Sequence, residues 1–335
     1  MKEWIKKQLN NKSYTIPVLT FPSAQLLNVS VDELVHSGKL QAEGMKKISE
    51  RCPMSASLTM MDLSLEAEAF GSTIKFSEDE VPTVIGHILN DIEDAKNLKV
   101  PEVGTKRTKE SLKAVELAKE LITDRPIFAG VTGPFSLAGR LMDMTEIMVN
   151  CYIDPDYVHI TLEKVTEFLI DYIKEFKARG ADGVVMAEPA AGLLSDDLCE
   201  EFSTVYVKKI KEAVDSEDFI FVYHNCGNVV PLIDSILSIG ADCYHFGNAI
   251  DIEEVLKKVP SDVVVMGNID PVSEFCYGTV DSIKASTLKL LELTKQYPNF
   301  VVSSGCDIPA KSSWDNIDAY FEVVKGFYEE VKSKR

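Results

Sequence analysis

The chain has 335 residues, of which 45% are hydrophobic and 26% are charged, values that are ordinary for a soluble globular protein. Its formal net charge of −18 argues against a nucleic-acid-binding protein, because phosphate backbones require a basic surface. The sequence contains no run of about 18 apolar residues and therefore predicts no membrane span.

The N-terminus and the cysteines indicate a compartment. Residues 1–7 lack the apolar core of a secretory signal peptide. The seven cysteines are scattered and odd in number, as expected for free thiols in a reducing environment rather than for a disulfide framework. We therefore predict a cytoplasmic protein.

Eight short apolar runs are typical of parallel strands that are buried under helices. From the third run onward they alternate with helical patterns, so we expect a single TIM (β/α)8 barrel over residues 1–335 with a helical extension at its N-terminus. An open, doubly wound α/β sheet is the alternative, but no glycine-rich phosphate fingerprint follows any run. The expected strands are residues 16–21, 56–61, 127–131, 183–187, 219–223, 243–246, 263–266 and 300–303.

The predicted helices and loops fill the intervals in a regular order. Residues 31–50 are expected to be helical, and residues 63–100 to form an irregular excursion over one face of the molecule. The most clearly bounded helix begins after Asp154, a capping residue followed by proline, and ends at Gly180. Further helices are expected at about 106–121, at 196–214, from 230, at 279–295 and at 315–333.

The stretch His224-Asn225-Cys226-Gly227 follows one of these strands directly. Residues two apart on an extended chain point to the same side, so His224 and Cys226 can direct an imidazole and a thiolate at one point. Cys306 ends the last strand in the same manner. One nitrogen and two sulfurs suit a tetrahedral Zn²⁺ with three protein ligands and an open fourth position. The sequence therefore predicts a catalytic zinc site that activates a thiol.

Other polar residues also follow predicted strands rather than precede them. In a barrel this places them around the C-terminal mouth, where active sites of the fold lie. They are Glu188, Asn268 and Asp270, which we expect to be catalytic, and Asp62, Thr132 and Asn248, which we expect to bind substrate. His245, which lies within the expected strand 243–246, is a further residue that we expect to bind substrate.

The fourth zinc ligand has two candidates among these residues. His245 could approach the metal if its side chain faces inward, and Glu188 ends the strand before His224. The ordinary alternatives are a core histidine with satisfied hydrogen bonds and a glutamate that caps a helix or forms a salt bridge.

Four segments resemble the uroporphyrinogen decarboxylase superfamily: residues 130–136, residues 224–227, residues 267–271 and Gly305-Cys306. Within it they look like the zinc-dependent corrinoid methyltransferases of the methylcobamide:coenzyme M methyltransferase type. The resemblance covers most of the chain from about residue 50, and its most specific part is the His-x-Cys pair followed by a distant cysteine. Cobalamin-independent methionine synthase has a similar zinc pattern on a similar barrel.

The resemblance implies a TIM barrel in which the residues matching His224, Cys226 and Cys306 hold Zn²⁺. It also implies that a small-molecule thiol enters as a zinc thiolate and attacks a methyl group on cobalt, which leaves Co(I). The methylcobamide would be carried by a partner corrinoid protein, because nothing in this chain resembles a corrinoid-binding module. Positioning and metal electrostatics are the main demands of such a reaction.

The chain departs from the resembled pattern at two points. Relatives often place an acidic zinc ligand near position 247, where this chain has Gly247-Asn248. The sulfonate of coenzyme M also requires a basic group, for which Arg140 and Lys311 are candidates. The identity of the thiol therefore stays open.

Two other functions are compatible with the superfamily. A uroporphyrinogen decarboxylase-like lyase would use an arginine-rich N-terminal segment to hold its carboxylates, but the first arginine of this chain is Arg51. A non-catalytic, zinc-stabilised corrinoid-binding protein would be expected to close its metal site with four protein ligands.

Overall fold

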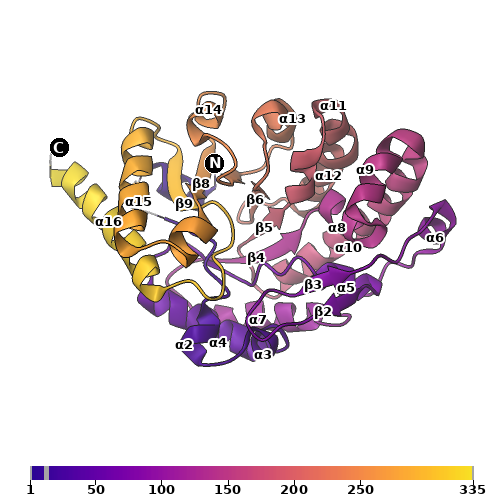
Figure 1. Ribbon diagram of the computed structural model, residues 1–335, viewed down its shortest axis with the longest axis horizontal. Coiled ribbons are helices and arrows are strands. Elements are labelled where there is room, and N and C mark those ends of the chain that lie inside the picture. Colours follow the sequence, from indigo (N-terminus) through magenta and orange to yellow (C-terminus); the bar gives the residue numbers. More distant parts are fainter. Residues whose placement is uncertain (1, 11–14, 334–335) are drawn as a thin grey trace.

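The computed structural model describes residues 2–10 and 15–333. Seven parallel strands form a curled sheet, and helices follow one another round its outside in chain order (Figure 1). This is an α/β fold of the TIM-barrel kind. In sheet order the strands are β1 (Ser57–Leu58), β4 (Ile127–Thr132), β5 (Gly183–Ala187), β6 (Ile220–Asn225), β7 (Cys243–Phe246), β8 (Val264–Ile269) and β9 (Phe300–Ser304).

The central strands are buried along their whole length. Every residue of β4, β5, β6, β7 and β9 is buried, because the barrel interior covers one face and the helices cover the other. The strand predictions from residue 127 onward are confirmed to within three residues at each end, with the largest difference at the C-terminal end of β8. These strands were predictable because each is a continuous apolar run in the sequence.

The first two expected strands require correction. Residues 16–21 form an extended segment without a regular ladder, and the second expected strand shrinks to β1. The segment still lies between β9 and β1: the Ile16 amide donates to the Val302 carbonyl over 3.4 Å, and the Ser55 amide donates to the Thr15 carbonyl over 3.0 Å. Side chains replace ladder bonds here, since Val18 N donates to Ser304 Oγ over 2.9 Å.

The helices agree with the predicted order and add several short elements. The Asp154 carboxylate caps α10 by accepting from the Tyr157 amide, and Gly180 ends it with φ of 96°. The helices are α1 (Glu3–Asn10), α2 (Ser23–Leu27), α3 (Val31–Val35), α4 (Gly38–Arg51), α5 (Leu65–Phe70), α6 (Ile92–Asn97), α7 (Thr108–Leu121), α8 (Pro134–Met142), α9 (Met144–Ile153), α10 (Pro155–Ala178), α11 (Asp196–Cys199), α12 (Val205–Val214), α13 (Ile233–Ser238), α14 (Ile252–Leu256), α15 (Val280–Thr294) and α16 (Trp314–Ser333). Short 3-10 or π segments are η1 (Pro189–Leu193), η2 (Glu200–Thr204), η3 (Val230–Leu232) and η4 (Pro271–Cys276).

The excursion at residues 63–100 is more regular than expected. It contains α5, α6 and an antiparallel hairpin of β2 (Thr73–Lys75) and β3 (Thr83–Ile85). Because it follows β1, it lies on the C-terminal side of the barrel and contributes to the mouth described below.

Helix α1 covers the opposite, N-terminal end of the strands. The Trp4 ring packs edge-on against Phe128, with centroids 5.1 Å apart, and its Nε1 donates to the Ser55 carbonyl over 3.1 Å. Lys2 forms ion pairs with Asp215 and Asp242, which precede β6 and β7. Residues 11–14 of the expected N-terminal extension lie outside the described residues.

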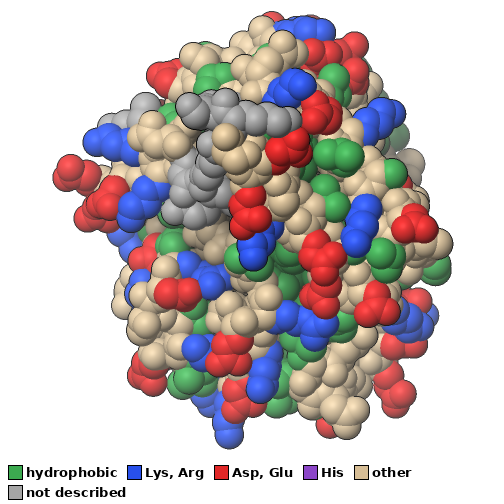
Figure 2. Space-filling model, turned by 90° about the vertical axis from the view of Figure 1, so that its left-hand side faces the viewer, with side chains coloured by type: hydrophobic (Ala, Val, Ile, Leu, Met, Phe, Trp, Pro, Cys, Tyr) green, Lys and Arg blue, Asp and Glu red, His purple; other side chains and the backbone are tan. Residues whose placement is uncertain are grey.

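The outer surface carries both signs of charge. On the face with α15 and α16, acidic and basic side chains are interspersed and apolar ones form small separate groups (Figure 2). Within the described residues, no helix is both long and apolar enough to cross a bilayer. All seven cysteines are free thiols.

Replacing Trp4 with alanine should destabilise the fold without disturbing the mouth. The lost packing of this half-buried ring should lower the free energy of unfolding by about 2–3 kcal/mol. Trp4→Phe keeps the ring contact and loses only the Nε1 hydrogen bond, which should cost about 1 kcal/mol. Urea unfolding measures both changes, and an unaltered midpoint for Trp4→Ala would contradict this role of α1.

Candidate metal centre

The candidate metal ligands stand at the C-terminal ends of β6 and β9. His224 lies in β6, Cys226 follows that strand, and Cys306 follows β9. One donor atom from each of these three residues lies within 4.8 Å of the other two. The structure thus brings together the three residues that the sequence analysis selected as metal ligands.

The spacing of these donors fits a tetrahedral metal. Zn–N and Zn–S bonds of about 2.05 and 2.3 Å give a tetrahedral N···S edge of about 3.6 Å. His224 Nε2 and Cys306 Sγ are 3.6 Å apart. One imidazole and two thiolates also form a donor set that Zn²⁺ prefers. The three side chains could therefore hold Zn²⁺ without rearrangement of the strands.

The pKa values of the Cys226 and Cys306 thiols are shifted in opposite directions. A hydrogen bond from Cys306, aided by His224, lowers the pKa of Cys226 well below its ordinary value. The same hydrogen bond and burial raise the pKa of Cys306. One sulfur is thus held as a thiolate, the form that binds metal, before any metal arrives.

Asn225 fixes the loop that carries Cys226. Its Oδ1 accepts from the Gly227 amide over 2.8 Å, and its Nδ2 donates to the Glu188 carbonyl over 2.7 Å. A β-carbon on Gly227 would lie 3.0 Å from the Gly192 Cα, so these two glycines allow the loops after β5 and β6 to touch.

Gly247 is packed directly against the same loop. A β-carbon at position 247 would lie 2.5 Å from the Cys226 Cα and 2.7 Å from its Cβ. Any larger residue must therefore displace Cys226. This explains in steric terms why this chain has no acidic side chain at position 247.

Cys226 and Cys306 line a cavity of about 680 Å³, the size of a small-molecule site. Its lining is mainly apolar and comes from the β2–β3 excursion, α8, η1 and the loops after β6 and β9. The lining residues are Met61, Leu63, Ser64, Val81, Pro82, Thr83, Val84, Arg140, Met144, Pro189, Ala190, Leu193, Cys226, Gly227, Cys306 and Asp307.

Arg140 is the single basic residue among the described residues that line this cavity. It projects from α8, and its Nη1 donates to the Ser136 carbonyl over 2.9 Å. Burial lowers its pKa, while the nearby carboxylates of Glu66, Glu188 and Asp62 raise it. No other described residue accepts a hydrogen bond from its remaining guanidinium donors, so an anionic group in the cavity could accept from them.

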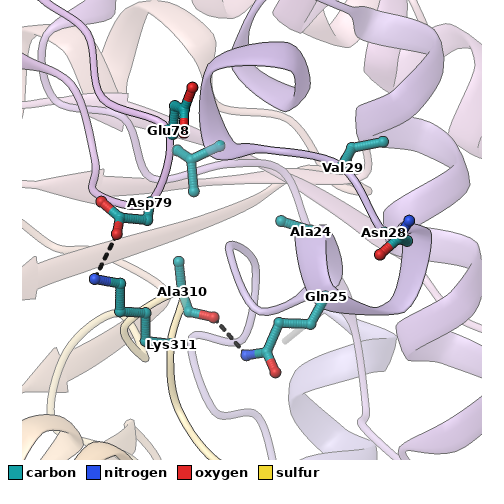
Figure 3. A pocket seen from close by; sticks show the side chains of 9 residues that line it. Ala24, Gln25, Asn28, Val29, Glu78, Asp79, Ala310 and Lys311 are labelled. Carbon is teal, nitrogen blue, oxygen red and sulfur yellow. Dashed lines mark hydrogen bonds and ion pairs between the residues drawn. The ribbon is translucent and has the colours of Figure 1, made fainter.

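Lys311, the other basic candidate, belongs to a different pocket. Its Nζ lies 2.5 Å from Asp79 Oδ2 in a pocket of about 410 Å³ beside α2 (Figure 3). Gln25 closes another side of that pocket by donating to the Ala310 carbonyl over 2.5 Å. Lys311 does not line the cavity of the metal ligands.

Glu188 and His245 are the two candidates for a fourth ligand, and neither belongs to the group of three residues that could hold a metal. Glu188 accepts from the amides of Phe135 and Ser136 over 2.9 and 2.6 Å, and so binds the N-terminus of α8. Burial raises its pKa to about 7 against these hydrogen bonds. His245 contacts His224 instead, with 2.7 Å between their Nδ1 atoms. The described residues that could hold a metal are therefore three, and the two cysteines among them line the cavity, from which a fourth ligand could reach the metal.

The remaining predicted residues mostly support the loops around the mouth. Asn268 Nδ2 donates to the Gly247 and Ile250 carbonyls, and Asp270 caps η4. Asp62 pairs with Arg107, and Thr132 donates to Glu66 Oε2 over 2.9 Å. Asn248 is exposed beside Gly305. Their assignment to catalysis or substrate binding stays a prediction.

Comparison with known proteins identifies the family. The uroporphyrinogen decarboxylase (URO-D) family model matches residues 18–327. The chain belongs to this family. Its relatives include the methylcobamide:CoM methyltransferase MtbA of Methanosarcina mazei, 28% identical over 294 residues that cover 85% of both chains. A methylated-thiol–coenzyme M methyltransferase of the same species is 25% identical over 305 residues, which cover 90% of this chain and 80% of that protein.

Decarboxylases are also among the relatives, and more distant barrels are among the structural neighbours. The uroporphyrinogen decarboxylase of Ruthia magnifica is 24% identical over 305 residues, which cover 88% of this chain. Among solved structures, a methyltransferase from Methanosarcina mazei superposes over 98% of both chains with a TM-score of 0.86 and 23% identity. A B12-independent methionine synthase from Shewanella reaches a TM-score of 0.59 at 12% identity. These structural likenesses establish the fold.

Gly247→Ala should weaken metal binding through steric displacement of Cys226. We expect the zinc dissociation constant to rise about 10-fold or more, as for other disturbed ligand geometries. The matched control is Gly326→Ala in α16, where a β-carbon meets nothing within 4 Å. Competition with a chromophoric chelator measures both constants, and equal affinities for the two variants would contradict the steric role of Gly247.

Proposed function

We propose that this member of the URO-D family is a zinc-dependent methyltransferase that transfers a methyl group from a methylated corrinoid protein to a small-molecule thiol. The observation that carries the proposal is the set of His224, Cys226 and Cys306, of which the two cysteines line a cavity that Arg140 also lines. The methyltransferase relatives and the structural neighbour support it.

The reaction is chemically consistent with this donor set. The thiol loses its proton, its sulfur forms a bond to the methyl carbon, and the carbon–cobalt bond breaks with its electron pair left on cobalt. When bound, Zn²⁺ would lower the pKa of the thiol and supply a sulfur nucleophile at neutral pH. A site with three protein ligands leaves one coordination position for the thiol, whereas a structural zinc site is closed by four protein ligands.

The protein's own residues would orient the thiol and exclude water. The apolar lining, which includes Met61, Leu63 and Val84, suits the aliphatic part of a short thiol. Arg140 would hold an acidic tail such as the sulfonate of coenzyme M. The thiol would then span the cavity, with sulfur at the cysteines and its anion at α8.

We propose that the corrinoid arrives on a separate protein, as the resemblance to corrinoid methyltransferases implies. The URO-D family model matches residues 18–327, which include all seven strands of the curled sheet. The cavity opens at the C-terminal mouth, where a partner could present a methyl group to the sulfur.

A decarboxylase is the alternative function, because several relatives are named uroporphyrinogen decarboxylase. A substrate with many carboxylates needs several free basic side chains. The cavity supplies Arg140 alone among its described lining residues, and Arg107 is held by Asp62 and Glu68. The residues at this mouth therefore favour the methyltransferase.

Metal analysis and zinc-edge X-ray absorption, with and without coenzyme M, test the proposal. We expect one zinc per chain with two sulfur neighbours and a third sulfur after addition of the thiol. His224→Ala should lose the metal. Four protein ligands that do not change when the thiol is added would favour a structural zinc site. Release of carbon dioxide from a porphyrinogen by the zinc-free protein would favour the decarboxylase.

Arg140→Leu should selectively impair anionic thiols. Loss of a hydrogen bond to a charged group should raise KM for coenzyme M about 10- to 100-fold, the equivalent of about 1.5–3 kcal/mol. KM for the neutral thiol 2-mercaptoethanol should change little, and Arg140→Lys should recover part of the loss. Lys311→Leu is the control in the separate pocket. Equal losses for charged and neutral thiols would exclude an anion-binding role.

A further inference from the structure

A chain of buried hydrogen bonds extends from His224 away from the cavity. His224 and His245 are direct neighbours in the register of β6 and β7, so both side chains point to the same side of the sheet. Their Nδ1 atoms are 2.7 Å apart. His245 Nε2 lies 2.8 Å from Ser303 Oγ, and Ser303 Oγ lies 2.8 Å from the Ile16 carbonyl oxygen.

The far end of this chain fixes the direction of every hydrogen bond in it. A carbonyl oxygen can only accept, so the Ile16 carbonyl takes the single hydroxyl hydrogen of Ser303. Ser303 must then accept from His245, which places a hydrogen on His245 Nε2. In a neutral imidazole the other nitrogen is an acceptor, so His245 Nδ1 must accept from His224 Nδ1.

The consequence appears at the metal-facing nitrogen. If the hydrogen of a neutral His224 resides on Nδ1, the lone pair of Nε2 is free and points toward Cys306, 3.6 Å away. The opposite tautomer would put a hydrogen on Nε2 and prevent coordination. The His245 carbonyl, 3.1 Å from His224 Nδ1, adds a second acceptor on the same side.

The surroundings keep His245 neutral, as this direction requires. Its ring is 2% exposed, and its nitrogens contact an imidazole and a hydroxyl, neither of which carries a negative charge. Ser303 is fully buried as well. Removal of any member would therefore leave a buried polar group without its partner.

We propose that His245, held by Ser303 and the Ile16 carbonyl, is a positioning residue that selects the metal-binding tautomer of His224. This inference rests on the metal-binding part of the proposed function. It gives a specific role to the irregular segment at residues 15–21, whose Ile16 carbonyl accepts from Ser303.

Nitrogen-15 NMR of the ring-labelled histidines tests the direction of the chain. The sequence has five histidines, so variants can assign the signals of His224 and His245. We expect His245 to carry its hydrogen on Nε2 and to leave Nδ1 bare, both in the metal-free and in the zinc-loaded protein. A hydrogen on His245 Nδ1 in either form would overturn the proposal. Because the metal-free measurement needs no zinc, failure of the proposed function would not obscure it.

Zinc affinity of matched variants tests the consequence. His245→Leu removes the side-chain acceptor of His224 Nδ1 and leaves only the backbone carbonyl of residue 245, 3.1 Å away. We expect this change to weaken zinc binding about 10- to 100-fold. His245→Asn offers an amide oxygen near the same place and should stay within a few-fold of the native protein. Circular dichroism and thermal unfolding verify that each variant folds.

The outcomes of the affinity experiment separate the two proposals. Native affinity in a folded His245→Leu variant would overturn the role of His245 while leaving the metal site intact. Equal losses in the Leu and Asn variants would reduce His245 to a packing residue. A native protein that binds no zinc would overturn the proposed function, whatever the tautomer of His245.

Discussion

The candidate site depends on the curl of the sheet. Its ligands come from the ends of β6 and β9, and two further strands, β7 and β8, lie between them. In a flat sheet three steps of about 4.8 Å would separate these ends by about 14 Å. The structure places His224 Nε2 and Cys306 Sγ 3.6 Å apart, which is possible because the strands curl round a common axis and their inward side chains converge.

The closing segment therefore matters more to the site than its irregular backbone suggests. Residues 15–21 join β9 to the residues before β1, and so keep the curl that brings the ligands together. Ser303 and Ser304 replace the missing ladder bonds with side-chain bonds to Ile16 and Val18. The same serine that helps to close the barrel is also the partner of His245, so closure and ligand orientation share one buried network.

Features that depend on residues close together in the sequence were predictable, whereas contacts between residues far apart in the sequence were not. The convergence of His224, Cys226 and Cys306 was predictable because all three lie at strand ends, the first two with a local i, i+2 spacing, and the apolar runs defined the later strands. Glu188 follows β5 as predicted, but its binding to α8 could not be foreseen, because no helix at residues 134–142 was predicted. The contact of His245 with Ser303 was equally hidden, since it depends on side-chain directions across several strands.

Charge balance relates the buried groups of the mouth to the proposed chemistry. Zn²⁺ with two thiolates has no net charge, and a third thiolate makes the centre negative in a mainly apolar cavity. Such a charge needs a nearby cation. Arg140 could supply it from α8, and because Glu188 binds the backbone amides at the start of that helix, it need not form a salt bridge with the arginine. The helix terminus thus satisfies the carboxylate, and the arginine would be left available to the acidic thiol that we propose as substrate.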